Sequence, residues 1–158
     1  MRAGAFAPAL ATVLLVPGLV SGCGGGEPST DDYCAALRDE KSTLQRLSDD
    51  RGGSGGPGLQ RAVKVFERLR EAAPADLRDE WTTYLNAWQG LVDALDAADA
   101  DTSVFRNGKR PPGVDREEYD AIRDSATKLT SPAVRDASTG IEAHASEVCD
   151  VELGGVVG

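Results

Sequence analysis

The spacing of apolar residues after position 30 constrains the fold of this 158-residue chain more than any other feature of its sequence. Apolar side chains recur every three or four positions, which places them on one face of an α-helix, whereas a half-buried β-strand needs strict alternation. Five segments follow the helical spacing, at residues 31–47, 59–69, 77–95, 115–129 and 132–149, and none follows the strand pattern. The sequence therefore predicts an all-α domain.

Cap and breaker residues mark several of the expected helix boundaries. Asp115 and Glu118 have the spacing of a capping box at a helix start. Ser131 and Pro132 have the order of a cap followed by a first helical residue. The Gly-rich stretch at residues 51–58 interrupts the helical pattern, and we expect a flexible linker there.

Residues 1–22 have the layout of a secretory signal peptide. A single charge at Arg2 is followed by a mostly apolar run and then by small residues. The end of this segment resembles the lipobox of bacterial lipoproteins, with the residues Val20, Ser21, Gly22 and Cys23. An ordinary cleaved signal with an incidental cysteine and an uncleaved membrane helix are the alternatives, and Pro8 and Pro17 argue against the membrane helix.

The lipobox resemblance implies a location. In such proteins the peptidase cuts before the cysteine, whose thiol carries a diacylglyceryl group, and a fatty acid such as palmitate is added to the new amino terminus. Two or more acyl chains anchor a protein stably, whereas one chain binds only marginally. We therefore expect Cys23 to hold the chain at the outer face of the cytoplasmic membrane, with residues 23–30 as lipidated tether, 31–150 as helical domain and 151–158 as frayed tail.

Lipidation of Cys23 would leave Cys34 and Cys149 as a pair, and outside the cytoplasm such a pair persists as a disulfide. The two positions differ by 149 minus 34, or 115, so the bridge would close nearly the whole domain. A loop of that size is worth about 4 to 5 kcal/mol on the chain-entropy model. Two free buried thiols, or a metal site completed by His144, are the alternatives, and a zinc site lacks its fourth ligand.

The expected disulfide limits the number of helices that can alternate in direction along the bundle. Successive helices of an up-and-down bundle alternate direction, so an even number returns Cys149 to the end where Cys34 lies. We therefore expect a four-helix-like bundle of four to five helices, closed by the disulfide. One pair of segments, joined at Pro132 or at Pro74, would act as one kinked helix.

The charge of the chain excludes some partners. The net charge is −9, and loss of Arg2 with the signal leaves 16 basic against 26 acidic residues, a net charge of −10. Such a surface repels nucleic acid, because binding phosphates depends on positive charge. Roughly 130 mature residues make one domain, and we expect no nucleic-acid partner.

Three matches to functional motifs lack the context that the motif needs. Residues 52–56 match the G-x-S-x-G of hydrolases, and the glycines within 53–58 match a phosphate-binding G-x-G-x-x-G, but both motifs require a strand before them. A calcium loop beginning at Asp99 would have Val104 where Gly is required and Arg110 where Glu is required. The sequence predicts no enzyme, no metal and no cofactor.

Three other features could bind something, although each has a simpler structural interpretation. The aromatic residues Trp81, Tyr84 and Trp88 could line an apolar ligand pocket, but at helical spacing such residues more often form core. His144 lies at the edge of the last apolar stripe, where a partly buried structural role is expected. A second loop, expected at residues 99–114, carries a basic cluster that could touch headgroups or a partner or could simply be solvated, namely Arg106, Lys109 and Arg110.

The mature chain as a whole resembles the small, uncharacterised helical lipoproteins of actinobacteria. The resemblance depends on the lipobox, the early Asp32–Leu37 segment, Glu80 with Trp81 after a central Ala-Pro, and the closing Cys149. It implies location and architecture, and it carries no activity to transfer. The sequence predicts a lipid-anchored extracytoplasmic module that binds an envelope protein or, alternatively, a small apolar ligand.

Overall fold

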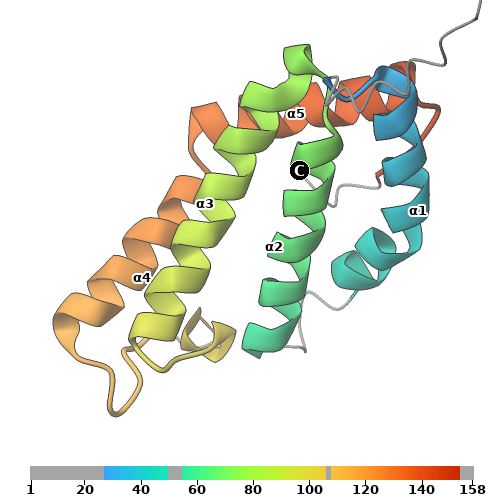
Figure 1. The fold of residues 1–158 in the computed structure, drawn as a ribbon. Coiled ribbons are helices and arrows are strands. Elements are labelled where there is room, and N and C mark those ends of the chain that lie inside the picture. Colours follow the sequence, from blue (N-terminus) through green and yellow to red (C-terminus); the bar gives the residue numbers. More distant parts are fainter. Residues whose placement is uncertain (1–26, 50–54, 106–107, 154–158) are drawn as a thin grey trace, which may run out of the picture.

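The computed structural model describes residues 27–49, 55–105 and 108–153, and within these ranges the chain is helical with no β-strand. The all-α prediction is confirmed. Two short 3-10 helices, η1 and η2, join longer α-helices (Figure 1). In chain order the elements are α1 (Thr30–Asp49), α2 (Gly55–Ala72), η1 (Ala75–Leu77), α3 (Arg78–Ala97), η2 (Thr102–Phe105), α4 (Arg116–Leu129) and α5 (Pro132–Glu147).

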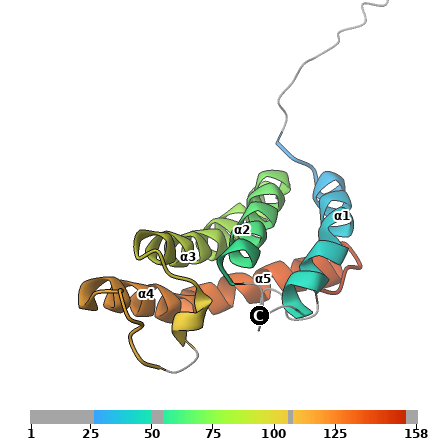
Figure 2. The same cartoon turned by 90° about the horizontal axis from the view of Figure 1, so that it is seen from below.

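Helix α3 is the centre of the bundle. It packs against α2 on one side and against both α4 and α5 on the other, while α1 lies along the far side of α2 (Figures 1 and 2). Because α3 contacts three other helices, it has apolar residues around much of its circumference.

Five helices return the chain to its starting end because two of them follow one another in the same direction. Helices α2 and α3 pack side by side across the turn at Pro74, so that turn is a hairpin and the kink proposed at Pro74 is wrong. Helices α4 and α5 contact each other little and follow one another along α3 (Figure 2). Helices α4 and α5, on either side of Pro132, run one after the other and together occupy the position of one helix. The bundle therefore has four helix positions, which alternate in direction.

Capping side chains set the starts of three helices. Asp115 and Glu118 form the expected capping box at α4, with the Asp115 side chain accepting from the Glu118 amide at 2.8 Å and the Glu118 side chain accepting from the Asp115 amide at 2.8 Å. The Ser131 side chain accepts from the Val134 amide at the start of α5. At α1 the Ser29 hydroxyl donates to the Asp32 carboxylate at 2.7 Å, which lowers the pKa of Asp32 from its usual 3.8.

The core consists of two clusters of buried residues along α3. The main cluster joins α1, α2, the first half of α3, α5 and the segment after Cys149, and includes Leu37, Phe66, Trp81 and Ile141. The second cluster joins the last turns of α3 to η2 and α4, and consists of Leu91, Leu95, Ala98, Val104, Val114 and Ile122. The disulfide end of the bundle therefore has a core separate from that of the loop end.

Two expectations about segments without strong periodicity are wrong. We expected residues 151–158 to be a frayed tail, but Val151 and Leu153 are buried in the main cluster at 2 % and 4 % exposure. Residues 154–158 lie outside the described ranges. We expected a linker through residue 58, but α2 already begins at Gly55. A helix tolerates Pro57 in its first turn, because amides there need no intrahelical acceptor.

The described parts of the expected loop, residues 99–105 and 108–114, also contain structure that the sequence pattern does not indicate. They contain η2, and their residues Val104 and Val114 are buried in the second cluster at 3 % and 6 % exposure. Single apolar residues between polar ones give no periodic signal, so the sequence pattern could not identify these two anchors.

Candidate functional site

Tyr33 and Trp81 form the polar centre of the main cluster at the disulfide end of the bundle. Both side chains are 0 % exposed, and the Trp81 indole Nε1–H donates to the Tyr33 hydroxyl oxygen at 2.9 Å. Tyr33 comes from the first turn of α1 and Trp81 from the first turn of α3, so this hydrogen bond joins two helices that are not neighbours in the chain. Burial outweighs this bond and raises the pKa of Tyr33 well above its ordinary 10.0.

The disulfide lies directly beside this pair. Cys34 follows Tyr33 in α1 and is bonded to Cys149, with a Cα–Cα distance of 5.1 Å. The two cysteines are 5 % and 0 % exposed. The Arg38 guanidinium donates to the Cys149 carbonyl oxygen at 3.0 Å, so α1 is joined to the end of α5 by a covalent and a polar link. The predicted pairing of Cys34 with Cys149 is confirmed.

Aromatic rings from all the helices at this end extend the cluster. The Tyr33 ring lies edge-on to His144 of α5, with centroids 5.4 Å apart. Phe66 of α2 contacts Trp81 and Tyr84, with ring centroids 6.2 Å and 5.1 Å away. Edge-on and tilted arrangements of this kind add about 0.5–1.5 kcal/mol per pair beyond the area buried. The cluster is packed as a core, and His144 has the structural position that its place in the stripe indicates.

The three aromatic residues that we considered as a pocket differ in burial. Trp81 and Tyr84 are 0 % and 3 % exposed, so they belong to the core. Trp88 is half-buried and packs at the rim of the same cluster, 6.1 Å from both Phe66 and Tyr84 by ring centroids. Trp88 is therefore the member of this group that a ligand could reach.

Several buried polar atoms at this end have no hydrogen-bond partner within the described residues. They are Arg70 Nε, Glu80 Oε2, Trp88 Nε1, Glu142 Oε1 and His144 Nδ1. The two indoles thus differ, because Trp81 has the Tyr33 oxygen as acceptor and Trp88 has none in this part of the chain. A buried polar group without a partner is costly, so these atoms lower the stability of this end of the bundle.

The other residues selected from the sequence lie elsewhere. Asp101, from the rejected calcium loop, accepts from the Ser103 amide at 2.8 Å. Among the described residues no group of three or more His, Cys, Asp or Glu side chains is placed to hold a metal ion. In the basic loop Lys109 is exposed, the Arg110 guanidinium donates to the Val114 carbonyl, and Arg106 is outside the described ranges.

The lipobox is also outside the described part of the chain, which begins at Glu27. The predictions for Val20, Ser21, Gly22 and Cys23 are therefore still predictions. Within the described residues no helix has the length and apolar character needed to cross a membrane.

Comparisons with known proteins leave the family undetermined. No protein-family model matches the chain, and the searches of curated proteins and of solved structures found no significant match. The resemblance to actinobacterial lipoproteins is therefore an expectation from the sequence alone. The site has to be interpreted from its own geometry.

Sequence reasoning missed the part that Tyr33 plays. Tyr33 stands four positions before Leu37, on the apolar face of α1, but the sequence analysis did not select it as a site residue. Once Cys34 is bonded to the residue that follows α5, its neighbour must lie close to the end of that helix. The cysteine pairing was thus the signal that could have placed Tyr33 against His144.

Proposed function

We propose that this protein is a lipid-anchored extracytoplasmic lipoprotein whose helical domain is a binding or interaction module. One observation carries the proposal, which is that the bond between Cys34 and Cys149 uses two of the three cysteines. Cys23 is then the single remaining thiol, and it follows a signal-like segment. An unpaired cysteine in an exported chain needs an explanation, and lipidation supplies one.

The position of the disulfide also suits an anchored domain. The described chain enters the domain beside α3, where the Glu27 carboxylate lies 3.5 Å from the Arg78 guanidinium, and α1 begins three residues later. Cys34 comes soon afterwards, so the covalent closure of the domain lies at the end that would face the membrane. We propose a binding rather than a catalytic role, because none of the sequence motifs for catalysis has its required context.

The mass of the intact protein from a membrane fraction tests the anchor. We expect a chain beginning at Cys23 with added acyl mass, and alkylation of Cys34 and Cys149 only after reduction. The matched control is Cys23→Ser, which keeps the disulfide and should lose the acyl mass. An uncleaved chain, or an unmodified Cys23 in the wild-type protein, would contradict the proposal.

Trp88 favours a second candidate, a module that binds a small apolar ligand. Its ring is half-buried at the rim of the aromatic cluster, and its buried Nε1 has no acceptor within the described residues. An apolar ligand could cover the exposed part of the ring. An apolar dye that quenches tryptophan fluorescence in wild-type protein and in Tyr119→Phe, but not in Trp88→Phe, would support this candidate. Equal quenching in all three would exclude it.

A further inference from the structure

Helix α1 is attached to the rest of the molecule in two different ways along its length. Its backbone lies side by side with α2, and it meets α5 near the end of that helix (Figures 1 and 2). The covalent bond and the hydrogen bonds that join α1 to α3 and to the end of α5 come from three residues in its first half, namely Tyr33, Cys34 and Arg38. The links between α1 and the α3–α5 side of the molecule are therefore concentrated around the disulfide.

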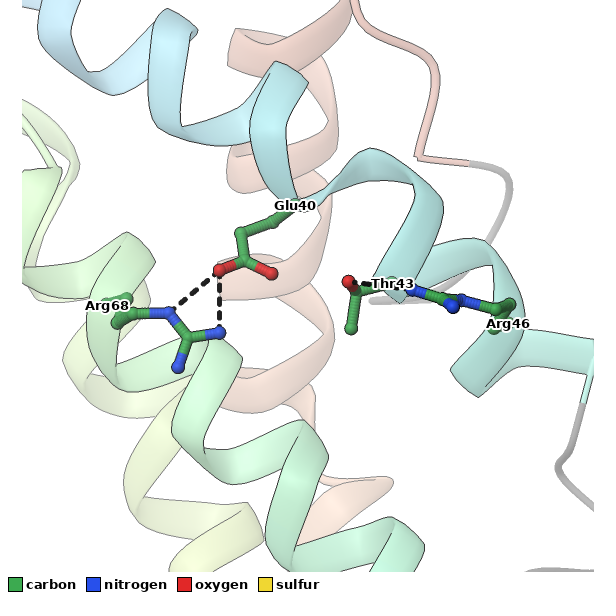
Figure 3. Close-up of polar contacts among 4 residues, drawn as sticks. All are labelled: Glu40, Thr43, Arg46 and Arg68. Atoms are coloured by element: carbon green, nitrogen blue, oxygen red, sulfur yellow. Dashed lines mark hydrogen bonds and ion pairs between the residues drawn. The ribbon is translucent and has the colours of Figure 1, made fainter.

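The second half of α1 has weaker polar links. Figure 3 shows the pair between α1 and α2, in which Glu40 accepts from Arg68 with the closest nitrogen 2.6 Å away. The Arg68 side chain is 54 % exposed, and exposed ion pairs contribute only about 0–1 kcal/mol. Arg46, also drawn in Figure 3, contacts Thr43 within α1 itself. Apolar side chains also hold this half of α1 on the main cluster, among them Leu44, which is 1 % exposed.

The segment after Cys149 closes the same junction from the other side. Val151 and Leu153 are buried in the main cluster, and the Val151 amide donates to the Ala145 carbonyl at 2.9 Å. The bonded Cys149 is the first residue of the segment 149–153, and its carbonyl oxygen accepts a hydrogen bond from Arg38. The disulfide thus fixes the two pieces of chain that close one side of the main cluster, α1 and the segment 149–153.

The remaining helices have contacts that do not involve α1. Helices α2 and α3 pair through Phe66, Trp81 and Tyr84, and α5 packs on α3 through residues such as Ile141. The second cluster contains no residue of α1. Proteins open in cooperative units of different stability. Helix α1 lies at the edge of the bundle, and its covalent bond and hydrogen bonds to α3 and to the end of α5 come from its first half, so it is a candidate for such a unit.

We infer that the Cys34–Cys149 disulfide is a redox-controlled clasp, whose reduction releases α1 and the segment 149–153 while α2 to α5 stay folded. The reductant is a dithiol, whose two thiols become a disulfide as the Cys34–Cys149 bond becomes two thiols. Because the cysteines are 5 % and 0 % exposed, the junction must open before the dithiol can attack.

The clasp has a consequence that rests on the proposed lipid anchor. Helix α1 contains 20 residues and lies between Cys23 and the α2–α5 body. Released, it would add those residues to the chain that joins the lipid to the body, and the reach of a flexible chain grows with the square root of its length. Dithiol reduction would therefore let the body move farther from the membrane.

Hydrogen exchange of the full chain, followed by mass spectrometry, tests the clasp without depending on lipidation. Wild-type protein is compared in oxidised form and after dithiothreitol, with reduction verified by mass. We expect exchange at least about tenfold faster in residues 33–44, and less than about threefold faster in 81–95 and 119–128. The Cys34→Ser, Cys149→Ser double variant should show the reduced pattern with or without dithiothreitol.

Either of two results would overturn the clasp. Uniformly faster exchange in all five helices would show that the disulfide stabilises the domain as one unit. Unchanged exchange in residues 33–44 of fully reduced protein would show that α1 stays docked without it. If the double variant does not fold, while reduced wild-type protein keeps its helical circular dichroism, the wild-type comparison alone decides. An unlipidated chain that still releases α1 would leave the clasp intact and refute only the anchor.

Discussion

Tyr33 of α1 contacts α3 through its hydroxyl and α5 through its ring. Removal of the hydroxyl tests the contact to α3 alone. In Tyr33→Phe the Trp81 indole N–H would lose its acceptor while it stays buried. A buried unsatisfied donor costs about 1–3 kcal/mol, so we expect a loss of unfolding free energy in that range. Chemical denaturation measures it, and the double variant with Trp81→Phe should cost less than the sum of the two single variants. Strict additivity would contradict the role of this bond.

The pKa of Tyr33 predicts how stability changes at alkaline pH. Burial raises the pKa of the folded-state hydroxyl above the ordinary 10.0 of the unfolded chain. The stability that this group contributes is therefore fully present below pH 10 and is lost as the pH rises above it, by up to about 1.4 kcal/mol per pH unit. The difference in unfolding free energy between wild type and Tyr33→Phe should shrink between pH 10 and 11. A constant difference would refute the assignment.

Asp99 ends α3 in a conformation that suits glycine better than aspartate. Its φ is 45°, and the Asp99 and Ala100 amides donate to the Asp96 and Leu95 carbonyls, as in a Schellman motif. Glycine adopts positive φ without a steric penalty, so Asp99→Gly should raise the unfolding free energy by about 0.5–1 kcal/mol. Thermal unfolding checks the sign. Asp93→Gly, at an exposed position inside α3, is the matched control and should destabilise the protein.

Among the elements, α4 depends most on its own ends. Ile122 is the one residue of this helix buried in the core, so packing contributes less to α4 than to α3. Asp115→Ala would remove the side-chain half of the capping box and should cost about 1 kcal/mol. Hydrogen exchange should become faster in residues 116–122 and stay unchanged in α5. The matched Ser131→Ala should do the reverse, and equal effects of both variants on both helices would contradict independent capping.

The helices could be predicted because each has either periodic burial or a cap that is visible in the sequence. The stripe from Leu77 to Leu95 became α3, and the capping box at Asp115 became the start of α4. The cysteine pairing predicted from the sequence is present and brings the ends of the domain together. These features are local or are set by a covalent bond, so they need no knowledge of the tertiary structure.

What the sequence could not predict depends on contacts between distant segments. Val104, Val114, Val151 and Leu153 lie outside the α-helices, and only the surrounding structure shows that they are buried. The bond between Trp81 and Tyr33 spans 48 positions, and no pattern in either helix indicates it. For the same reason sequence analysis could not separate Trp88, at the rim of the cluster, from the buried Trp81.

At the scale of the whole molecule, the two clusters raise the question of whether the domain unfolds as one unit. Helix α3 belongs to both clusters, and all the other helices attach to it directly or through α2. The disulfide closes only the main cluster, since Cys34 and Cys149 both belong to it. The disulfide therefore lies at one end of α3, and the second cluster lies at the other end of the same helix.

Two isoleucines provide a matched test of this division. Ile141 in the main cluster and Ile122 in the second are both 0 % exposed, so truncation to alanine removes the same atoms from equally buried positions. Each change should cost about 2–5 kcal/mol in unfolding free energy.

The distribution of hydrogen exchange then distinguishes one unit from two. Because α4 packs on the last turns of α3, Ile122→Ala should speed exchange in residues 116–129 and leave α1 and the disulfide junction protected. Ile141→Ala should speed exchange in α5 and α1 and leave α4 comparatively protected. If both variants lose protection evenly over the whole domain, α3 transmits every perturbation and the two clusters act as one core.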